Sequence, residues 1–299
     1  MAVRITVRSL VLSSFALDGG AMHGIVPKPL WERVHPADAQ NRVALVARAI
    51  LVDDATSGAR TLVELGGGQR WSAKERAIYA FAPGPDVPDV LREAGVDPDT
   101  VTHVVLTHLH WDHAGGLVLS GDAPRLAFPR AEHVVGRACL AHAGHPSEKD
   151  AGSFRREDIE LLQRTGTLRL WDEGDTLAPG LTGRLAQGHT EGQIIPWIKE
   201  RDDGPPLAIP TDLIPTRSHL KPGWVMAYDN HPAVTAAEKR ALIGELHAVG
   251  GGVVLYHDPL VEAAFTRDMG RGPELCPARL DGSVMPRASE AGSAVRTAR

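Results

Sequence analysis

The chain has 299 residues, of which 43% are hydrophobic and 23% are charged, a balance typical of a globular protein with a substantial core. Its net charge of −5 argues against a nucleic-acid partner held by a broad basic surface, and no apolar run is long enough to span a bilayer. The cysteines, Cys139 and Cys276, stand far apart. They indicate neither a disulfide framework nor a CxxC metal site, and they favour a reducing, cytoplasmic compartment.

Alternating apolar residues predict that the chain begins with a strand over residues 1–15. An export signal is the alternative, but the apolar stretch is short and interrupted by serines. Further strands are predicted at 43–53 and 61–68. The Gly- and Pro-rich segment 18–38 is predicted to be a long ordered loop, because its large apolar side chains would be costly to leave in water. These side chains are Met22, Ile25, Leu30 and Trp31.

Helices and strands alternate through the rest of the chain. Helices are predicted at 86–97, 148–164 and 235–250, and strands at 101–107, 167–172, 182–187, 205–212 and 251–258. The last helix is expected to bury one apolar face, formed by Ala237, Leu242, Ile243 and Leu246. Residues 1–285 are expected to form a single domain, and 286–299, rich in Arg, Ala and Ser, a disordered tail.

Four predicted strands end at a residue that can bind a metal. The strand at 101–107 leads into "HLHWDH", and the other three lead to His189, Asp212 and His257. Loops that follow strands are where rigid scaffolds carry chemistry, and this coincidence is difficult to reach by chance. The candidate ligands are therefore His108, His110, Asp112, His113, His189, Asp212 and His257.

The spacing within "HLHWDH" suits two neighbouring metals. His108 and His110 are two residues apart and can share one face of an extended loop, while Asp112 and His113 turn in another direction. Imidazole and carboxylate ligands together suit Zn, and also Fe, Mn or Co. Taken singly, a histidine such as His189 would more often be structural and an Asp a turn residue or helix cap, so the metal interpretation depends on the whole set.

"THLHWDHAGG", followed by "GHT", an Asp and a His after a strand, resembles the metallo-β-lactamase superfamily over nearly the whole chain. The resemblance implies an α/β fold, the αβ/βα sandwich, in which two mixed β-sheets are flanked by helices and metals lie at one edge between them. "DGGAMHGIVPKPLW" and "DLIPTRSHLKPGW" followed by "AYDNHP" resemble the branch that contains lactonases and methyl parathion hydrolase.

The resemblance also assigns ligands to two divalent metal ions, with Zn expected and Mn, Co or Fe possible. His108, His110 and His189 should hold one metal, Asp112, His113 and His257 the other, and Asp212 should bridge both. A mononuclear-iron thiol or persulfide dioxygenase, which uses the first triad, is the alternative. The complete second set favours two metals, and true β-lactamases fit the pattern less well.

The activity implied is a binuclear metal-dependent hydrolase, in which a hydroxide bridging the metals attacks a carbonyl carbon or a phosphorus. Asp112 or Asp212 would relay the proton to the leaving group. The expected partner is a neutral, ester-like small molecule, a lactone ahead of a phosphotriester. No nucleic-acid or membrane partner is expected, and the chain could form a homodimer.

Two departures from the branch matter. Lactonases carry a tyrosine shortly after the bridging Asp, where this chain has Leu213, Ile214 and Pro215, and Tyr228 is the alternative. Glu64 stands where the family usually has an Asp, and is expected to orient a ligand histidine.

Apolar residues of 19–31 and 213–231, with Trp111, are expected to form the mouth of the site, about half of them being core. They are Met22, Ile25, Trp31, Leu213, Ile214, Leu220, Trp224, Met226 and Tyr228. Lys28, Arg217 and Lys221 are not placed facing the metals. His133 is expected in a strand, Cys139 packed in a helix, and His142 and His145 at the surface or the pocket edge.

Overall fold

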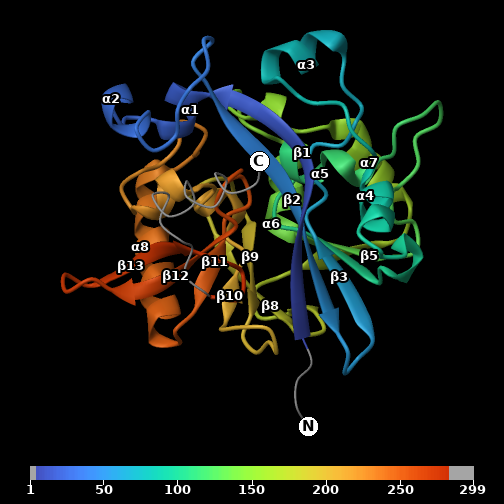
Figure 1. The fold of residues 1–299 in the computed structure, drawn as a ribbon. Coiled ribbons are helices and arrows are strands. Elements are labelled where there is room, and N and C mark those ends of the chain that lie inside the picture. Colours follow the sequence, from blue (N-terminus) through green and yellow to red (C-terminus); the bar gives the residue numbers. More distant parts are fainter. Residues whose placement is uncertain (1–4, 283–299) are drawn as a thin grey trace, which may run out of the picture.

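Two β-sheets lie face to face in the computed structural model, which describes residues 5–282 (Figure 1). The first sheet has the order β1 (Ile5–Asp18), β2 (Arg42–Asp54), β3 (Ala59–Val63), β4 (His103–Leu106), β5 (Glu132–Gly136), β6 (Leu168–Trp171). The second has the order β13 (Pro273–Ala278), β12 (Ala263–Asp268), β11 (Gly252–Val254), β10 (Leu207–Ala208), β9 (Gln193–Ile198), β8 (Leu181–Ala186), β7 (Thr176–Ala178). Both sheets contain parallel and antiparallel pairs.

Helices cover the outer faces of both sheets. Beside the first sheet lie α4 (Val87–Glu93), α5 (Trp111–Ala114), α6 (Arg137–Gly144) and α7 (Arg156–Arg164), and beside the second lies α8 (Pro232–Ala248). At one end, the top of Figure 1, are α1 (Gly19–His23), α2 (Lys28–Trp31) and α3 (Ala73–Tyr79). Short 3₁₀ turns are η1 (Pro98–Thr100), η2 (Gly115–Leu117), η3 (Ala151–Ser153), η4 (Thr211–Leu213) and η5 (Arg217–Leu220). The expected αβ/βα sandwich is confirmed.

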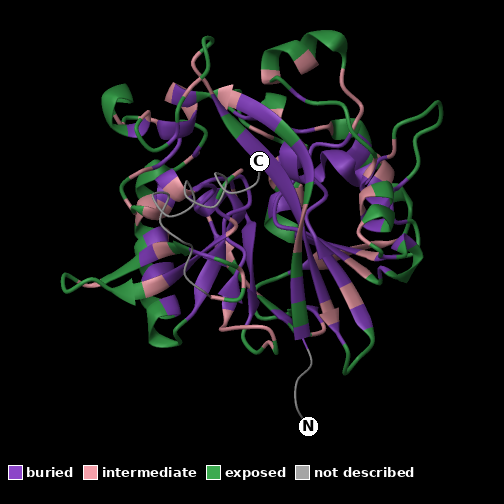
Figure 2. Cartoon of the chain, in the orientation of Figure 1, coloured by how far each residue is buried: buried purple, intermediate pink, exposed green. Residues whose placement is uncertain are grey.

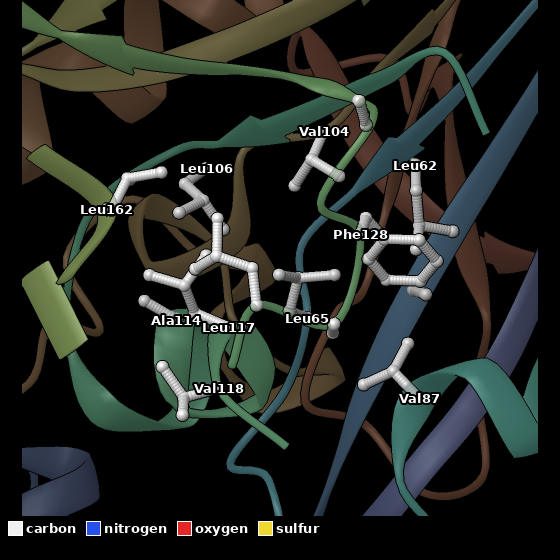
Figure 3. Close-up of a cluster of buried hydrophobic side chains, with 14 of the residues drawn as sticks. Leu62, Leu65, Val87, Val104, Leu106, Ala114, Leu117, Val118, Phe128 and Leu162 are labelled. Atoms are coloured by element: carbon white, nitrogen blue, oxygen red, sulfur yellow. The ribbon is translucent and has the colours of Figure 1, made fainter. Parts of the chain in front are cut away.

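Strand β4 shows how the sequence builds these layers. Successive side chains of a strand point to opposite faces, so Val105 packs between the two sheets while Val104 and Leu106 pack under the helices (Figure 3). Buried residues concentrate in the sheets, and exposed residues cover the outer helices and loops (Figure 2). Burying one such aliphatic side chain contributes about 1.5–3 kcal/mol, so both faces of β4 hold the start of "HLHWDH" in place.

Glycines allow the backbone around α5 to pack without side chains. A Cβ on Gly116 would lie 2.1 Å from the carbonyl oxygen of Leu65, and one on Gly68 would lie 2.2 Å from that of Gly115. Gly68 also has a positive φ of 63°, which glycine adopts at little cost. The loop after β3 therefore packs directly on the loop that carries the histidine cluster.

Several predicted boundaries were wrong for identifiable reasons. The helix predicted at 148–164 begins only at Arg156, because Asp150 turns inward to accept hydrogen bonds from His142 and Ser147. The strand predicted at 205–212 is reduced to β10, since prolines at 205, 206 and 210 cannot donate to a sheet. The predicted strand at 251–258 ends at Val254.

Burial also differs from expectation in two segments. The loop 18–38 contains α1 and α2, and it buries Met22 and Trp31 but leaves Ile25 91% exposed. On α8, Ala237 is exposed and Lys239 is buried.

Strands β7, β9, β12 and β13 and helix α3 were not predicted, and the expected tail at 286–299 lies outside the described residues. Within the described part, no helix is long and apolar enough to cross a membrane.

Candidate metal centre

The seven candidate ligands lie together at one edge of the sandwich. Four lie in the loop after β4 and in α5, and the others follow β8, β10 and β11, so both sheets contribute. All seven are buried, with at most 7% of any of them exposed. Placement at the ends of strands, as the sequence indicated, fixes their backbones on two rigid sheets.

These residues form two groups that share Asp212. His108, His110, His189 and Asp212 make one group, and Asp112, His113, His257 and Asp212 make the other; within each, the potential ligand atoms lie within 4.8 Å of one another. Asp212 directs its two oxygens to different groups. Oδ1 lies 3.1 Å from Nε2 of both His113 and His257, and Oδ2 lies 3.2 Å from Nε2 of His189.

These separations fit atoms that surround a cation. Ligands about 2.0–2.1 Å from a tetrahedral Zn lie roughly 3.4 Å apart. Here His257 Nε2 lies 3.2 Å from His113 Nε2, and His189 Nε2 lies 3.1 Å from His110 Nδ1. His108 Nε2 and Asp212 Oδ1 are buried with no hydrogen-bond partner among the described residues. Buried polar atoms without partners are costly, so this donor set fits divalent metals.

Hydrogen bonds at the far side of each ring orient three of the histidines. In each ring Nδ1 faces an oxygen acceptor, so Nδ1 donates and Nε2 keeps its lone pair for the centre. The pairs are His113 Nδ1 with Glu64 Oε2 at 3.0 Å, His189 Nδ1 with Asp229 Oδ1 at 3.0 Å, and His257 Nδ1 with the Val46 carbonyl at 2.8 Å.

Glu64 and Asp229 have matching roles in the two groups. The second oxygen of Glu64 accepts the Thr107 N–H at 2.7 Å, and that of Asp229 accepts the Met226 N–H at 3.1 Å. The position of Glu64 agrees with the expectation from its sequence. The role of Asp229 was missed, because no local pattern links it to His189.

The buried carboxylate of Asp212 is stable only with positive charge beside it. Burial holds the pKa of His108 and of His110 well below the ordinary histidine value, which leaves both rings neutral and able to bind a metal. Burial opposes ionisation of Asp212, but His113 and His257 outweigh it and hold the pKa of Asp212 well below its usual range. Against burial, Asp212 raises the pKa of His113. The buried carboxylate thus needs protons or metal cations beside it.

A cavity of about 250 Å³ opens onto both groups. Met22, Trp111, Met226 and Tyr228 line it as expected, and Tyr79, which the sequence did not indicate, lines it too. The other expected residues lie elsewhere: Trp31, Leu213 and Ile214 are in the core, Ile25 is exposed, and Leu220 and Trp224 line a different cavity.

Three cationic residues from the segments expected to flank the metals do not line this pocket: Lys28, Arg217 and Lys221. Lys28 contacts Glu32, Arg217 pairs with Asp258, and Lys221 lies over the ring of Trp224.

Lys149 lines the pocket but is occupied by the protein. Its Nζ donates to the carbonyl oxygens of Tyr228 at 2.6 Å and of Asp229 at 3.0 Å, and to Oδ1 of Asn230 at 3.2 Å. All three ammonium protons are therefore used. Lys149 fixes the loop that carries Asp229 and Tyr228, and it leaves no proton for an anionic substrate.

Asp150 also holds this loop in place, because it contacts both His142 of α6 and Asn230. Its Oδ2 faces His142 Nε2 at 2.6 Å and accepts Asn230 Nδ2 at 2.9 Å, while His142 Nδ1 faces Glu191 Oε2 at 3.1 Å. Because these hydrogen bonds satisfy the cluster internally, we interpret it as structural. His142 is half-buried beside Asp150, which lines the pocket, and His145 is exposed, while His133 lies in β5 and Cys139 is packed in α6.

Comparison with known proteins agrees with this geometry. The family model described as Metallo-beta-lactamase superfamily matches residues 43–243. An N-acyl homoserine lactonase, AttM, from Rhizobium johnstonii is 28% identical over 190 residues, 60% of this chain and 66% of that protein. AiiB, an N-acyl homoserine lactonase from Agrobacterium fabrum, is 32% identical over 139 residues, 44% of this chain and 48% of that protein. The chain thus spans about half to two thirds of the length of these curated relatives.

Solved structures show the same fold. A probable metal-dependent hydrolase from Staphylococcus aureus has a TM-score of 0.81 and 25% identity, over 94% of this chain and all of that one. AidC, a dizinc quorum-quenching lactonase, has a TM-score of 0.72 and 19% identity, over 94% of this chain and 97% of that one. From the family match together with the seven converging side chains, we conclude that this chain belongs to the metallo-β-lactamase superfamily.

Proposed function

We propose that the protein is a metal-dependent hydrolase that cleaves a neutral, ester-like small molecule, with a lactone as the favoured substrate. The observation that carries this proposal is the position of Asp212, whose two oxygens face two complete ligand groups at the base of a partly apolar pocket. The lactonase activity of AttM and AiiB supports the lactone as the first choice.

The first metal would be held by His108, His110 and His189 and the second by Asp112, His113 and His257, with Asp212 shared. Zn is the expected metal, and Mn, Co or Fe could bind the same donors. When bound, the cations would lower the pKa of a water held between them and polarise the substrate oxygen. All the ligands of the second group are present, which favours two metals over a mononuclear iron site.

Because both ligand groups contain residues from both sheets, we also propose that residues 1–285 act as one domain.

Asp112 is the proposed proton carrier. Its carboxylate lines the pocket and lies 3.5 Å from His257 Nε2. A carboxylate at the edge of the pocket can accept a proton from the attacking water and deliver it to the leaving alcohol. Its backbone is fixed by Tyr256, whose hydroxyl donates to the Asp112 carbonyl at 2.8 Å.

Tyr228 is the proposed donor to the substrate oxygen as negative charge develops. Its ring lines the pocket, its hydroxyl has no hydrogen bond among the described residues, and Lys149 fixes its backbone carbonyl. Burial raises the pKa of Tyr228, so the phenol stays protonated and can donate a hydrogen bond to the substrate oxygen. Oxyanion donors of this kind typically contribute about 10²–10³ in rate.

A substrate panel tests the proposal. With metal content matched, the enzyme should cleave acyl lactones and aryl esters faster than an aryl phosphotriester, a β-lactam or a phosphodiester. Preference for the phosphotriester would change the order of substrates but keep the mechanism. Preference for the β-lactam or the phosphodiester would refute the proposed substrate class.

A further inference from the structure

A second cavity, larger than the pocket over the metal centre, lies between α8, β13 and the segment from Arg217 to Trp224. It measures about 800 Å³ and shares no lining residue with the metal pocket. Figure 1 shows α8 beside β13, the edge strand of the second sheet. None of the candidate metal ligands or proposed catalytic residues lines this cavity, so the metal centre does not account for it.

The walls of the second cavity are apolar. The apolar lining residues include Leu220 and Trp224, Ile243 of α8 and Leu275 of β13. Ile243 and Leu275 are 4% and 6% exposed, whereas Trp224 is only partly covered by the protein. A partly covered indole beside buried aliphatic side chains is a surface on which a hydrocarbon chain can pack.

Cations surround this apolar surface. Lys221, Arg240 and Arg271 line the cavity and are exposed, and none forms an ion pair within the described part of the chain. Lys221 lies over the ring of Trp224, so Arg240 and Arg271 are the cations with neither kind of contact. Arg217 is already neutralised, since its Nη1 donates to Asp258 Oδ1 at 2.6 Å. Glu274 is the single acidic residue among the described lining residues. The local excess of positive charge contrasts with the net charge of −5 of the whole chain.

We propose that the second cavity binds an alkyl carboxylate, a molecule with one anionic head group and a linear hydrocarbon chain. Arg240 and Arg271 would bind the carboxylate through charge-assisted hydrogen bonds, and the chain would lie against Trp224 and Ile243. The cavity volume falls within the range of small-molecule sites. This assignment does not depend on the reaction at the metal centre.

The affinity of the second cavity should depend on the length of the alkyl chain. Each methylene group that enters the cavity should tighten binding by up to about fourfold, until the chain exceeds the cavity. The charged head should add about tenfold or more over a neutral alcohol of equal length. The full-length protein would be titrated calorimetrically with hexanoate, octanoate and decanoate, and with decanol as the neutral probe.

Gly244 offers a variant that fills the cavity without disturbing the fold. It lies within α8, lines the cavity, and an added Cβ would meet nothing within 4 Å. Replacing a helical glycine also favours the helix, so Gly244→Leu should keep or raise the melting temperature. We expect Gly244→Leu to weaken decanoate binding at least tenfold and Arg240→Glu to weaken decanoate but not decanol.

Arg164→Glu is the matched control, because it makes the same charge change at an exposed position of α7, outside this cavity, and it should leave decanoate binding unchanged. Equal binding of decanol and decanoate, or unchanged decanoate binding by Gly244→Leu, would overturn the proposal. So would a dimer in sedimentation that Gly244→Leu dissociates, since the cavity would then be an interface between copies. Binding to anionic vesicles without binding of monomeric decanoate would also refute it.

Discussion

Replacing Glu64 with glutamine should weaken one metal site selectively. The Glu64 carboxylate is buried, and its two oxygens accept the Thr107 N–H at 2.7 Å and His113 Nδ1–H at 3.0 Å. A glutamine has one oxygen and one NH₂ group in those places. One of the two donors must then face another donor, or His113 must change tautomer and direct its proton from Nε2 toward the metal.

The expected magnitude follows from this geometry. Loss of such a supporting hydrogen bond typically costs 10- to 100-fold in metal affinity, which is about 1.4–2.7 kcal/mol. The effect should fall on the group of Asp112, His113 and His257. Asp229→Asn is the matched variant, because Asp229 supports His189 in the other group through the same pair of contacts. It should weaken the group that contains His189 by a similar factor.

The assay is titration of metal-free protein with Zn²⁺ against a competing chelator, which yields two dissociation constants. Glu64→Gln should raise one constant and Asp229→Asn the other, while melting of the metal-free variants reports any loss of stability separately. If both variants raised the same constant, or neither changed any, the assignment of these carboxylates to separate groups would be wrong.

Three further results are expected. Asp212→Ala should remove the shared ligand, lower the metal content and reduce turnover by more than about 100-fold, a loss greater than that of a supporting partner; wild-type metal content would contradict it. Tyr228→Phe should lower kcat about 100-fold with unchanged metal content, whereas equal losses in Tyr79→Phe would point to a general packing effect. Burial lowers the pKa of His23 to about 4, so the unfolded chain takes up a proton near its ordinary value of 6.5 before the folded chain does. His23 alone should therefore lower the unfolding free energy of metal-free protein by at most about 3 kcal/mol between pH 6.5 and pH 4. The fall in His23→Gln should be smaller by that amount, and an equal fall in the two proteins would show that this ring is not buried in its neutral form.

The candidate ligands could be found from sequence because their signal is local. His108 to His113 lie within one short loop after a buried strand, and the remaining ligands each follow an apolar run, so strand ends could be recognised one at a time. The layered fold was implied by the family resemblance.

The supporting residues could not be found in this way, because their partners are distant in sequence. Asp229 contacts His189 across 40 positions, and Lys149 contacts Tyr228 across 79. The exposure of Ile25 and the burial of Lys239 also depend on tertiary packing. Lys239 donates to the Trp224 carbonyl at 2.5 Å, a contact that no periodicity within α8 could indicate.

Metal analysis of protein purified without added metal tests the central claim most directly. The account predicts about two equivalents of Zn, Mn or Co per chain, and about one equivalent or less after Asp212→Ala. About one equivalent of Fe per chain, with oxygen consumed in the presence of a thiol or persulfide, would contradict the account and favour a mononuclear dioxygenase.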